Sequence, residues 1–237
     1  MSVFGIDVSS FNVITSWSDI RAAGKEFCMI QAGNDLNGQN SMLMNHVAGC
    51  NSAGIKYGLY WFCYALNTTE AYQNGQLCGQ IIRQNNLQPY YPVYYDVERT
   101  GYHGARAGSV EYWEDNGITP TPAFCQSIIT AFCNGLKSVI PGIVFGVYFN
   151  QSMYVEFDYA SMFLSHTDWS HWIAQWDPYE PSWTTWDIWQ YGEGPVNGHS
   201  GNVDLDVLHD GWTPPTPPGP TPGTRKLPIW FYLKFPF

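Results

Sequence analysis

The sequence predicts an α/β barrel of the TIM type whose last strands follow one another without intervening helices. Three observations predict it. The chain has 237 residues, which suits one barrel domain plus an appendage. Hydrophobic residues make up 45% of the chain, enough for a large core. Up to residue 149, short apolar runs alternate with helix-like stretches, a pattern typical of a parallel sheet covered by helices.

The regular part of the predicted barrel has five strand–helix units. Candidate strands occupy 3–8, 27–32, 57–64, 91–97 and 143–149, and helix-like stretches occupy 17–24, 41–53, 69–85 and 122–139. Thr121-Pro122 is a typical helix start, and Gly54 suits a left-handed helix end. Three more strands are expected at 171–176, 185–191 and 203–208, separated by gaps too short for full helices. The sequence therefore predicts an irregular (β/α)5β3 barrel over residues 1–212.

The C-terminal end differs from the barrel in composition. Residues 213–224 read TPPTPPGPTPGT, which predicts a stiff, Pro-rich linker. Residues 225–237 form a short aromatic and basic tail, too short to fold alone or to span a bilayer. We expect this tail either to support self-association or surface docking, or to pack back on the chain or stay disordered.

Charge and cysteine content limit the function classes. The net charge is −10, and a phosphate backbone would repel such a chain, so nucleic acid is not an expected partner. The six cysteines form no CxxC pair, and buried free thiols are the simplest interpretation. No apolar run is long enough for a membrane span. Aromatic residues make up 17%, which predicts a ring-lined groove, with an aromatic core as the alternative.

The sharpest chemical feature is the pair Asp96 and Glu98 in YPVYYDVERT. Alternate residues of a strand point to the same face, and the two carboxyls follow the fourth strand, where TIM barrels place catalytic groups. Close carboxylates disfavour each other's ionisation, so one pKa rises and its carboxyl can protonate a glycosidic oxygen. The alternative is a structural pair that only salt-bridges, for example to Arg99.

Two further acidic positions end predicted strands. Asp7 follows the first strand, and Asp204 lies in the last one, within GNVDLDV. Asp206 has the same strand parity as Asp204, so periodicity does not separate them. Together the carboxylates predict an acidic cleft, which suits an oxocarbenium-like transition state. No HExxH, GxSxG, Walker A or GxGxxG motif occurs, and no metal or organic cofactor is implied.

A series of motifs resembles glycoside hydrolase family 25, the Chalaropsis-type lysozymes that include many phage endolysins. In order along the chain they are GIDVSSFN, YGLYWFCYA, YPVYYDVE, GVYFN, HWIAQWD, DIWQYG and GNVDLDV. The resemblance implies a (β/α)5β3 barrel that cleaves the β-1,4 bond between N-acetylmuramic acid and N-acetylglucosamine. One departure is Phe11-Asn12, where many members have an aromatic residue followed by Gln-Gly.

The resemblance also implies roles for single residues. Glu98 matches the general acid/base, and Asp96 matches the partner of the substrate's 2-acetamido group, with either that group or a carboxylate as nucleophile. Asp7 and Asp204 match the other two acids of the cleft. Residues in motifs that line the groove are Tyr60, Phe62, Tyr64, Tyr148, Trp176, Gln190 and Tyr191. The long segment 100–117 is expected to cover the cleft or set substrate preference.

The expected function is therefore peptidoglycan hydrolysis, with bacterial peptidoglycan as the partner. The alternative is a non-catalytic barrel that binds cell-wall glycan. No signal peptide precedes VFGIDVSS, which favours a protein made in the bacterial cytoplasm that acts on the cell wall, as a phage or prophage lysin does. A secreted enzyme is the alternative.

Overall fold

The computed structural model describes residues 2–157, 166, 168–182 and 185–215. Its nine strands form one sheet, and all but the short β3 close into a barrel through the β1–β2 pairing. The strands are β1 (Phe4–Val8), β2 (Lys25–Asn34), β3 (Gly38–Gln39), β4 (Lys56–Phe62), β5 (Val93–Val97), β6 (Phe145–Asn150), β7 (Ser170–Ala174), β8 (Ile188–Pro195) and β9 (Asn202–Leu208). This barrel confirms the predicted fold class.

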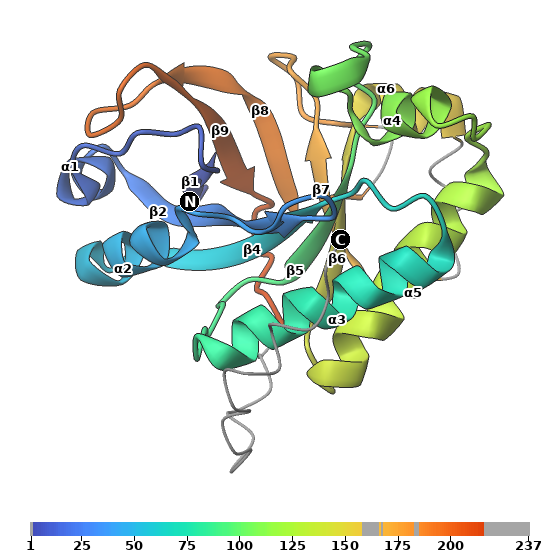
Figure 1. The fold of residues 1–237 in the computed structure, drawn as a ribbon. Coiled ribbons are helices and arrows are strands. Elements are labelled where there is room, and N and C mark those ends of the chain that lie inside the picture. The colour runs from blue at the N-terminus through green and yellow to red at the C-terminus, as the bar shows by residue number, and fades with distance from the viewer. Residues whose placement is uncertain (1, 158–165, 167, 183–184, 216–237) are drawn as a thin grey trace.

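Helices cover the barrel unevenly (Figure 1). They are α1 (Trp17–Ala22), α2 (Leu43–Ala53), α3 (Thr68–Gln84), the 3-10 turn η1 (Gly104–Arg106), α4 (Ser109–Asp115), α5 (Pro122–Val139) and α6 (Gln151–Phe157). The long helices α3 and α5 lie side by side, whereas α1 and α2 pack against β2. None of the described helices follows β7, so the barrel ends as three strands joined by loops.

Two features of the observed topology differ from the sequence prediction. The helices α4 and α6 were not predicted, because short helices give little periodicity to detect. The last strand, β9, runs antiparallel to both of its neighbours, β8 and β1, in a sheet otherwise expected to be parallel. Its direction follows from the short connection after Pro195, because a turn of a few residues can only reverse the chain.

The core has two parts, separated by the barrel wall. Outward strand residues such as Tyr95 and Phe145 pack against the helices, together with Phe132 of α5. The barrel interior is unusually aromatic. It is filled by Phe27, Met29, Tyr60, Tyr91, Tyr94, Tyr148, Trp172, Ala174, Ile188 and Leu208. Both expectations for the aromatic residues therefore apply, because rings fill the interior and also form the floor of a groove.

The six cysteines are all free and buried, as the sequence predicted. No helix in the described part of the chain is both long and apolar enough to span a membrane. The predicted linker continues past the last described segment, and the whole tail, 225–237, lies outside the described residues. Its predicted role in association or docking stays a prediction.

One carboxylate ties three strands together at the end of the barrel that carries the site. Asp35, directly after β2, accepts hydrogen bonds from the indole of Trp61, the hydroxyl of Tyr95 and the backbone of Tyr64 and Ala65, at 2.7 to 2.8 Å. Burial raises the pKa of Asp35 to about 6, although these donors oppose the shift. The carboxylate thereby positions the start of the loop that follows β4.

We predict that Asp35→Ala lowers the free energy of unfolding by about 3–5 kcal/mol, because it leaves several enclosed donors without an acceptor. Chemical denaturation at pH 7 measures the change. The exposed Asp210, replaced by Ala, is the matched control and should change stability by less than about 0.5 kcal/mol. Equal effects from the two substitutions would contradict the assigned role of Asp35.

Candidate active site

A cleft of about 600 Å³ opens at the carboxyl end of the parallel strands. This is the end at which TIM barrels place their catalytic groups. Ten of the eleven residues predicted from the sequence line it. They are Asp7, Tyr60, Phe62, Tyr64, Asp96, Glu98, Tyr148, Trp176, Gln190 and Asp204. The strands thus bring together side chains that are separated by nearly two hundred positions in the sequence.

Asp96 and Glu98 come from β5 and the residue after it, and both point inward. Asp96 lies in register with Phe62 of β4 and Tyr148 of β6, which places the pair between two aromatic side chains of the cleft. The backbone N–H of Glu98 donates to the hydroxyl of Ser109 at 3.2 Å, which holds the strand end against α4. Tyr148 hydrogen-bonds with the Glu98 side chain. These contacts confirm that the two carboxyls share one face.

Asp7 and Asp204 face Asp96 and Glu98 from the other side of the barrel. The two residues are directly paired across β1 and β9. Asp7 ends a strand that runs towards the cleft, whereas Asp204 lies near the start of a strand that runs away from it. Only the antiparallel direction of β9 brings residue 204 to the mouth of the barrel.

Burial dominates the electrostatics of these four carboxyls. It raises the pKa of Glu98 to about 7, with further increases from Asp204 and Glu111 and an opposing hydrogen bond from Tyr148. It raises the pKa of Asp204 to about 6, helped by Glu193. Burial also raises the pKa of Asp96, and repulsion from Glu98 raises it further. The pKa of Asp7 is raised in the same way by burial and then by repulsion from Asp204. Near neutral pH the cleft therefore contains a carboxylic acid able to give up a proton.

Gln190 organises the side of the cleft opposite β5. Its amide oxygen accepts from the hydroxyl of Tyr148 and from the indole of Trp176, both at 3.1 Å. Its amide N–H donates to Asp7 Oδ2 at 2.8 Å. The side chain is buried, so these bonds hold a tyrosine, a tryptophan and a carboxylate in one arrangement.

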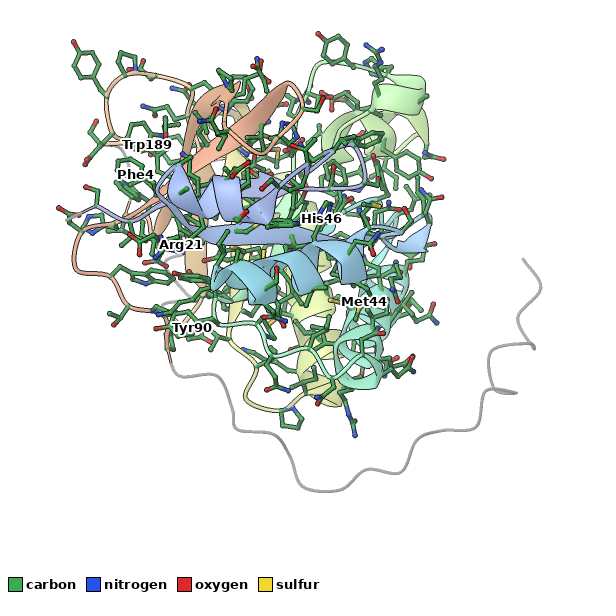
Figure 2. All side chains as sticks on the ribbon, turned by 90° about the vertical axis from the view of Figure 1, so that its left-hand side faces the viewer. Phe4, Arg21, Met44, His46, Tyr90 and Trp189 are labelled. Carbon is green, nitrogen blue, oxygen red and sulfur yellow. The ribbon has the colours of Figure 1, made fainter. Side chains whose placement is uncertain are left out.

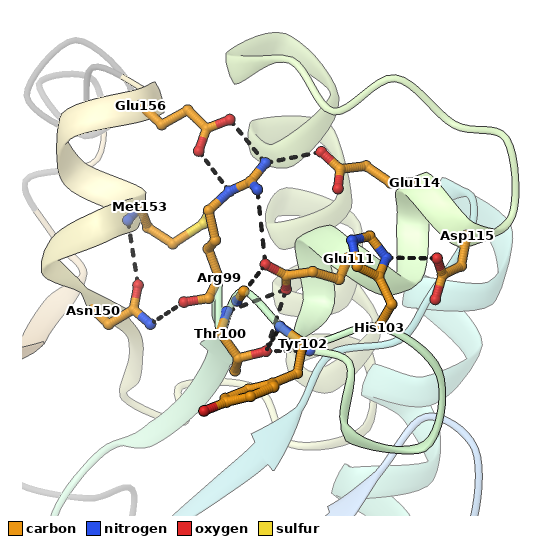
Figure 3. Close-up of polar contacts among 12 residues, drawn as sticks. Arg99, Thr100, Tyr102, His103, Glu111, Glu114, Asp115, Asn150, Met153 and Glu156 are labelled. Atoms are coloured by element: carbon orange, nitrogen blue, oxygen red, sulfur yellow. Dashed lines mark hydrogen bonds and ion pairs between the residues drawn. The ribbon is translucent and has the colours of Figure 1, made fainter.

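The segment 100–117 is held in a folded arrangement by the polar contacts that Figure 3 shows. Its buried Glu111 accepts from the backbone of Thr100 at 3.1 Å and of Gly101 at 2.7 Å. Arg99 pairs with Glu111, Glu114 and Glu156, which ties α4 to α6. Arg99 is thus bound to other acids, and the alternative in which it pairs with Asp96 or Glu98 is wrong.

This segment reaches the cleft itself. Ala105 lines the cleft, and the hydroxyl of Tyr64 donates to the carbonyl of Ala107 at 3.3 Å. Segment 100–117 therefore borders the cleft, whereas its expected role as a cover of the cleft stays a prediction. Its effect on substrate preference stays a prediction.

Tyr191 is the predicted site residue that the structure does not bring to the cleft. Neighbouring residues of a strand face opposite ways, so with Gln190 inside, Tyr191 lies on the outer face of β8. It packs against Phe4 and Trp189, which Figure 2 shows beside each other on that face. A second depression of about 710 Å³ runs past these three rings and meets the cleft only at Trp176. Strand parity alone could have excluded Tyr191.

Several residues of the cleft were not predicted. Trp172 shares the inward parity of Trp176 in HWIAQW, and this signal could have identified it. Gln31 and Asn34 line the cleft from β2, where no motif marked them. Phe11, which directly precedes the position where the first motif departs from the family pattern, is 91% exposed on the rim. Among the described residues, no cluster of three His, Cys, Asp or Glu side chains could hold a metal ion.

Comparison with protein families agrees with this arrangement of acids in a barrel. The model of the family described as glycosyl hydrolases family 25 matches residues 6–199, which is most of the chain. The chain belongs to glycosyl hydrolase family 25. A search of curated protein sequences gives no match.

Three solved structures share the fold. The autolysin LytC from Streptococcus pneumoniae is 22% identical with a TM-score of 0.70, over 88% of this chain and 47% of that one. The catalytic domain of endolysin ply40 from bacteriophage P40 of Listeria monocytogenes is 19% identical with a TM-score of 0.63, over 89% and 94%. A family 25 glycosyl hydrolase from Bacillus anthracis is 18% identical with a TM-score of 0.64, over 87% and 88%. The chain therefore spans about half the length of LytC and most of the other two.

We predict that Trp176→Ala raises KM for a soluble glycan substrate about tenfold with little change in kcat. The indole is 60% exposed at the cleft edge and held by Gln190, so its loss removes a stacking surface worth about 1.4 kcal/mol. Steady-state kinetics measure both constants. Tyr191→Ala on the outer face is the matched control. An unchanged KM in Trp176→Ala would show that this ring does not contact substrate.

Proposed function

We propose that this family 25 chain is an N-acetylmuramidase that hydrolyses the β-1,4 bond between N-acetylmuramic acid and N-acetylglucosamine in bacterial peptidoglycan. The observation that carries the proposal is Glu98, a carboxyl with a pKa raised to about 7, placed with three other carboxyls in an aromatic cleft. Glycoside hydrolysis uses a carboxylic acid that donates a proton and a second carboxyl group beside it, and this cleft holds Glu98 and Asp96 together.

Glu98 serves as the proton donor to the leaving glycosidic oxygen. Tyr148 hydrogen-bonds with its side chain, and burial keeps the acid protonated near neutral pH. After the bond breaks, the resulting carboxylate can take a proton from the attacking water, so the same residue acts first as acid and then as base.

Asp96 serves as the partner of the sugar's 2-acetamido group. Its Oδ1 is buried and has no hydrogen-bond donor among the described residues, which leaves it free to accept a substrate N–H. That bond would orient the acetamido oxygen towards the anomeric carbon and favour its attack. Asp7 and Asp204 complete the negative environment that stabilises the oxocarbenium-like transition state.

Bacterial peptidoglycan is the proposed partner, and the cell wall the proposed place of action. Two solved relatives support this choice. LytC has been solved in complex with a synthetic peptidoglycan ligand, and ply40 is an endolysin of a bacteriophage. We propose for this chain a role in cell-wall lysis of the kind that phage or prophage lysins perform.

The deciding experiment is digestion of purified peptidoglycan by the wild type and by Glu98→Gln, followed by mass analysis of the reduced products. We expect products ending in reduced muramic acid from the wild type and at least a 1,000-fold lower rate from the variant. Glu26→Gln, an exposed residue at the other end of β2, is the control and should keep full activity.

Each of the other outcomes would rule out one part of the proposed function. Products ending in reduced glucosamine would mean that the enzyme is a glucosaminidase. Saturable wall binding without products from either protein would support a glycan-binding barrel. Full activity of Glu98→Gln would remove Glu98 from the chemistry.

The pH dependence follows from the same residue. Because Glu98 must carry its proton and its pKa is raised to about 7, we expect kcat/KM to fall as pH rises through 7 and to approach a tenfold loss per pH unit above about pH 8. Initial rates on a soluble peptidoglycan fragment between about pH 4 and about pH 9 measure the profile. A flat profile up to about pH 9 would contradict a protonated Glu98 as the donor.

A further inference from the structure

We propose that Gln31 and Asn34 form a pair of hydrogen-bond donors that selects an N-acetylated sugar beside the reacting one. The group they bind is the acyl carbonyl oxygen of the neighbouring N-acetylglucosamine. The identity of that sugar rests on the proposed function. The donor pair itself rests on the hydrogen bonds of β2 and of the turn that follows it.

A β-bulge gives the two side chains a common face. Gln31 and Asn34 are three positions apart, and in a regular strand such residues face opposite ways. Gln31 is in register with Tyr60 of β4, and the register then slips by one residue at Ala32. Asn34 is therefore in register with Phe62. Tyr60 and Phe62 are alternate residues of β4, and all four side chains line the cleft.

The orientation of the Gln31 amide follows from a nearby backbone N–H. The N–H of Met42 can only donate, and it donates to Asn40 Oδ1 at 2.8 Å. The other end of that amide, Asn40 Nδ2, therefore donates to Gln31 Oε1, at 2.6 Å. Asn40 is buried, so water does not compete for these bonds. Because its oxygen is taken, Gln31 offers its Nε2 donor to the cleft.

Asn34 is oriented in the same way by the turn after β2. Its Oδ1 accepts from the backbone N–H of Leu36 at 3.0 Å and of Asn37 at 2.7 Å. Strand β3 closes this turn, and Gly33 permits it, because a Cβ there would lie 2.2 Å from the carbonyl oxygen of Gly38. The Asn34 oxygen is thus occupied, and its Nδ2 is the group left for a ligand.

Two such donors supply what the acids of the cleft lack. Neither amide nitrogen of the pair donates to a partner within the described part of the chain. Ionised carboxylates only accept, so they can bind the O–H and N–H groups of a glycan but not a carbonyl oxygen. Other donors of the cleft are already engaged, because Tyr148 and Trp176 both donate to Gln190. The amide pair therefore complements an acyl carbonyl.

The position of the pair indicates which acyl group it binds. Gln31 and Asn34 lie on β2, two strands away from Asp96 on β5. The acetamido group assigned to Asp96 must keep a lone pair of its carbonyl oxygen for attack on the anomeric carbon. A hydrogen bond donated to that oxygen would weaken the attack. The pair therefore suits the next sugar, and both neighbours of a muramic acid in peptidoglycan are N-acetylglucosamine.

Three substitutions in the full chain remove the donors and separate this loss from added charge. Gln31→Glu keeps the acceptor that Asn40 needs, whereas Gln31→Met removes the donor without adding a charge. Asn34→Asp keeps the acceptor that the turn needs and removes the donor. Asn51→Asp, on the exposed face of α2, is the control.

Substrate preference tests the selection of the acyl group. Two soluble peptidoglycan fragments are compared, one fully N-acetylated and one in which only the glucosamine units carry free amines. We expect wild type and Asn51→Asp to favour the acetylated fragment by at least about tenfold in kcat/KM. The three donor variants should reduce this preference to about threefold or less.

Other kinetic outcomes would overturn the proposal. No preference in wild type, or an unchanged preference in the donor variants, would show that the pair does not select the acyl group. A preference that is lost in Gln31→Glu and kept in Gln31→Met would show an effect of charge alone.

Nitrogen NMR tests the contact without turnover. The side-chain NH2 signals of Gln31 and Asn34 are assigned through the variants that remove them. In the full chain carrying Glu98→Gln, the acetylated fragment should shift both signals, and the free-amine fragment should shift them less. Unshifted signals, or equal shifts with both fragments, would overturn the proposal. If wild type shows no turnover, the proposed function fails, while this titration still decides whether the pair binds an acetylated glycan.

Discussion

The site depends on one constraint, the inward alternation of side chains in a closed barrel. Every second residue of each strand must face a narrow interior, so polar groups there meet across the barrel. Asp7, Asp96 and Asp204 all occupy inward positions at one end, above a layer of rings that includes Tyr60, Tyr148 and Trp172. The rings exclude water, and carboxyls pressed together in such a place resist ionisation. The raised pKa values, and with them the acid chemistry, follow from that crowding.

The irregular end of the barrel completes the acid cluster. Three strands without described helices between them allow a short turn after β8, and this turn reverses β9. The reversal matters chemically, because a parallel β9 would have placed Asp204 at the opposite end of the barrel, away from the cleft. The same reversal sets Asp204 above Asp206, so one acid reaches the cleft and the other lies beneath Asp7. A change in topology thus places two acids of one strand in different surroundings.

A chain of hydrogen bonds connects the interior of the barrel to the edge of the cleft. It runs from Asp7 to the amide N–H of Gln190, whose amide oxygen accepts from Tyr148 and Trp176. Tyr148 in turn contacts Glu98, so the two sides of the cleft are not independent. Buried networks of this kind specify one arrangement when every member has its partner.

By itself the sequence determined the fold class, the order of the longer strands and helices up to β6 and the inward face that carries Asp96 and Glu98. These follow from local periodicity and strand parity, which need no knowledge of distant contacts. Parity would also have excluded Tyr191. Tertiary structure alone decided the direction of β9, the difference between Asp204 and Asp206, and the partners of Arg99. These three properties depend on which distant segments are in contact and on how exposed each side chain is to water. A local sequence pattern contains neither kind of information.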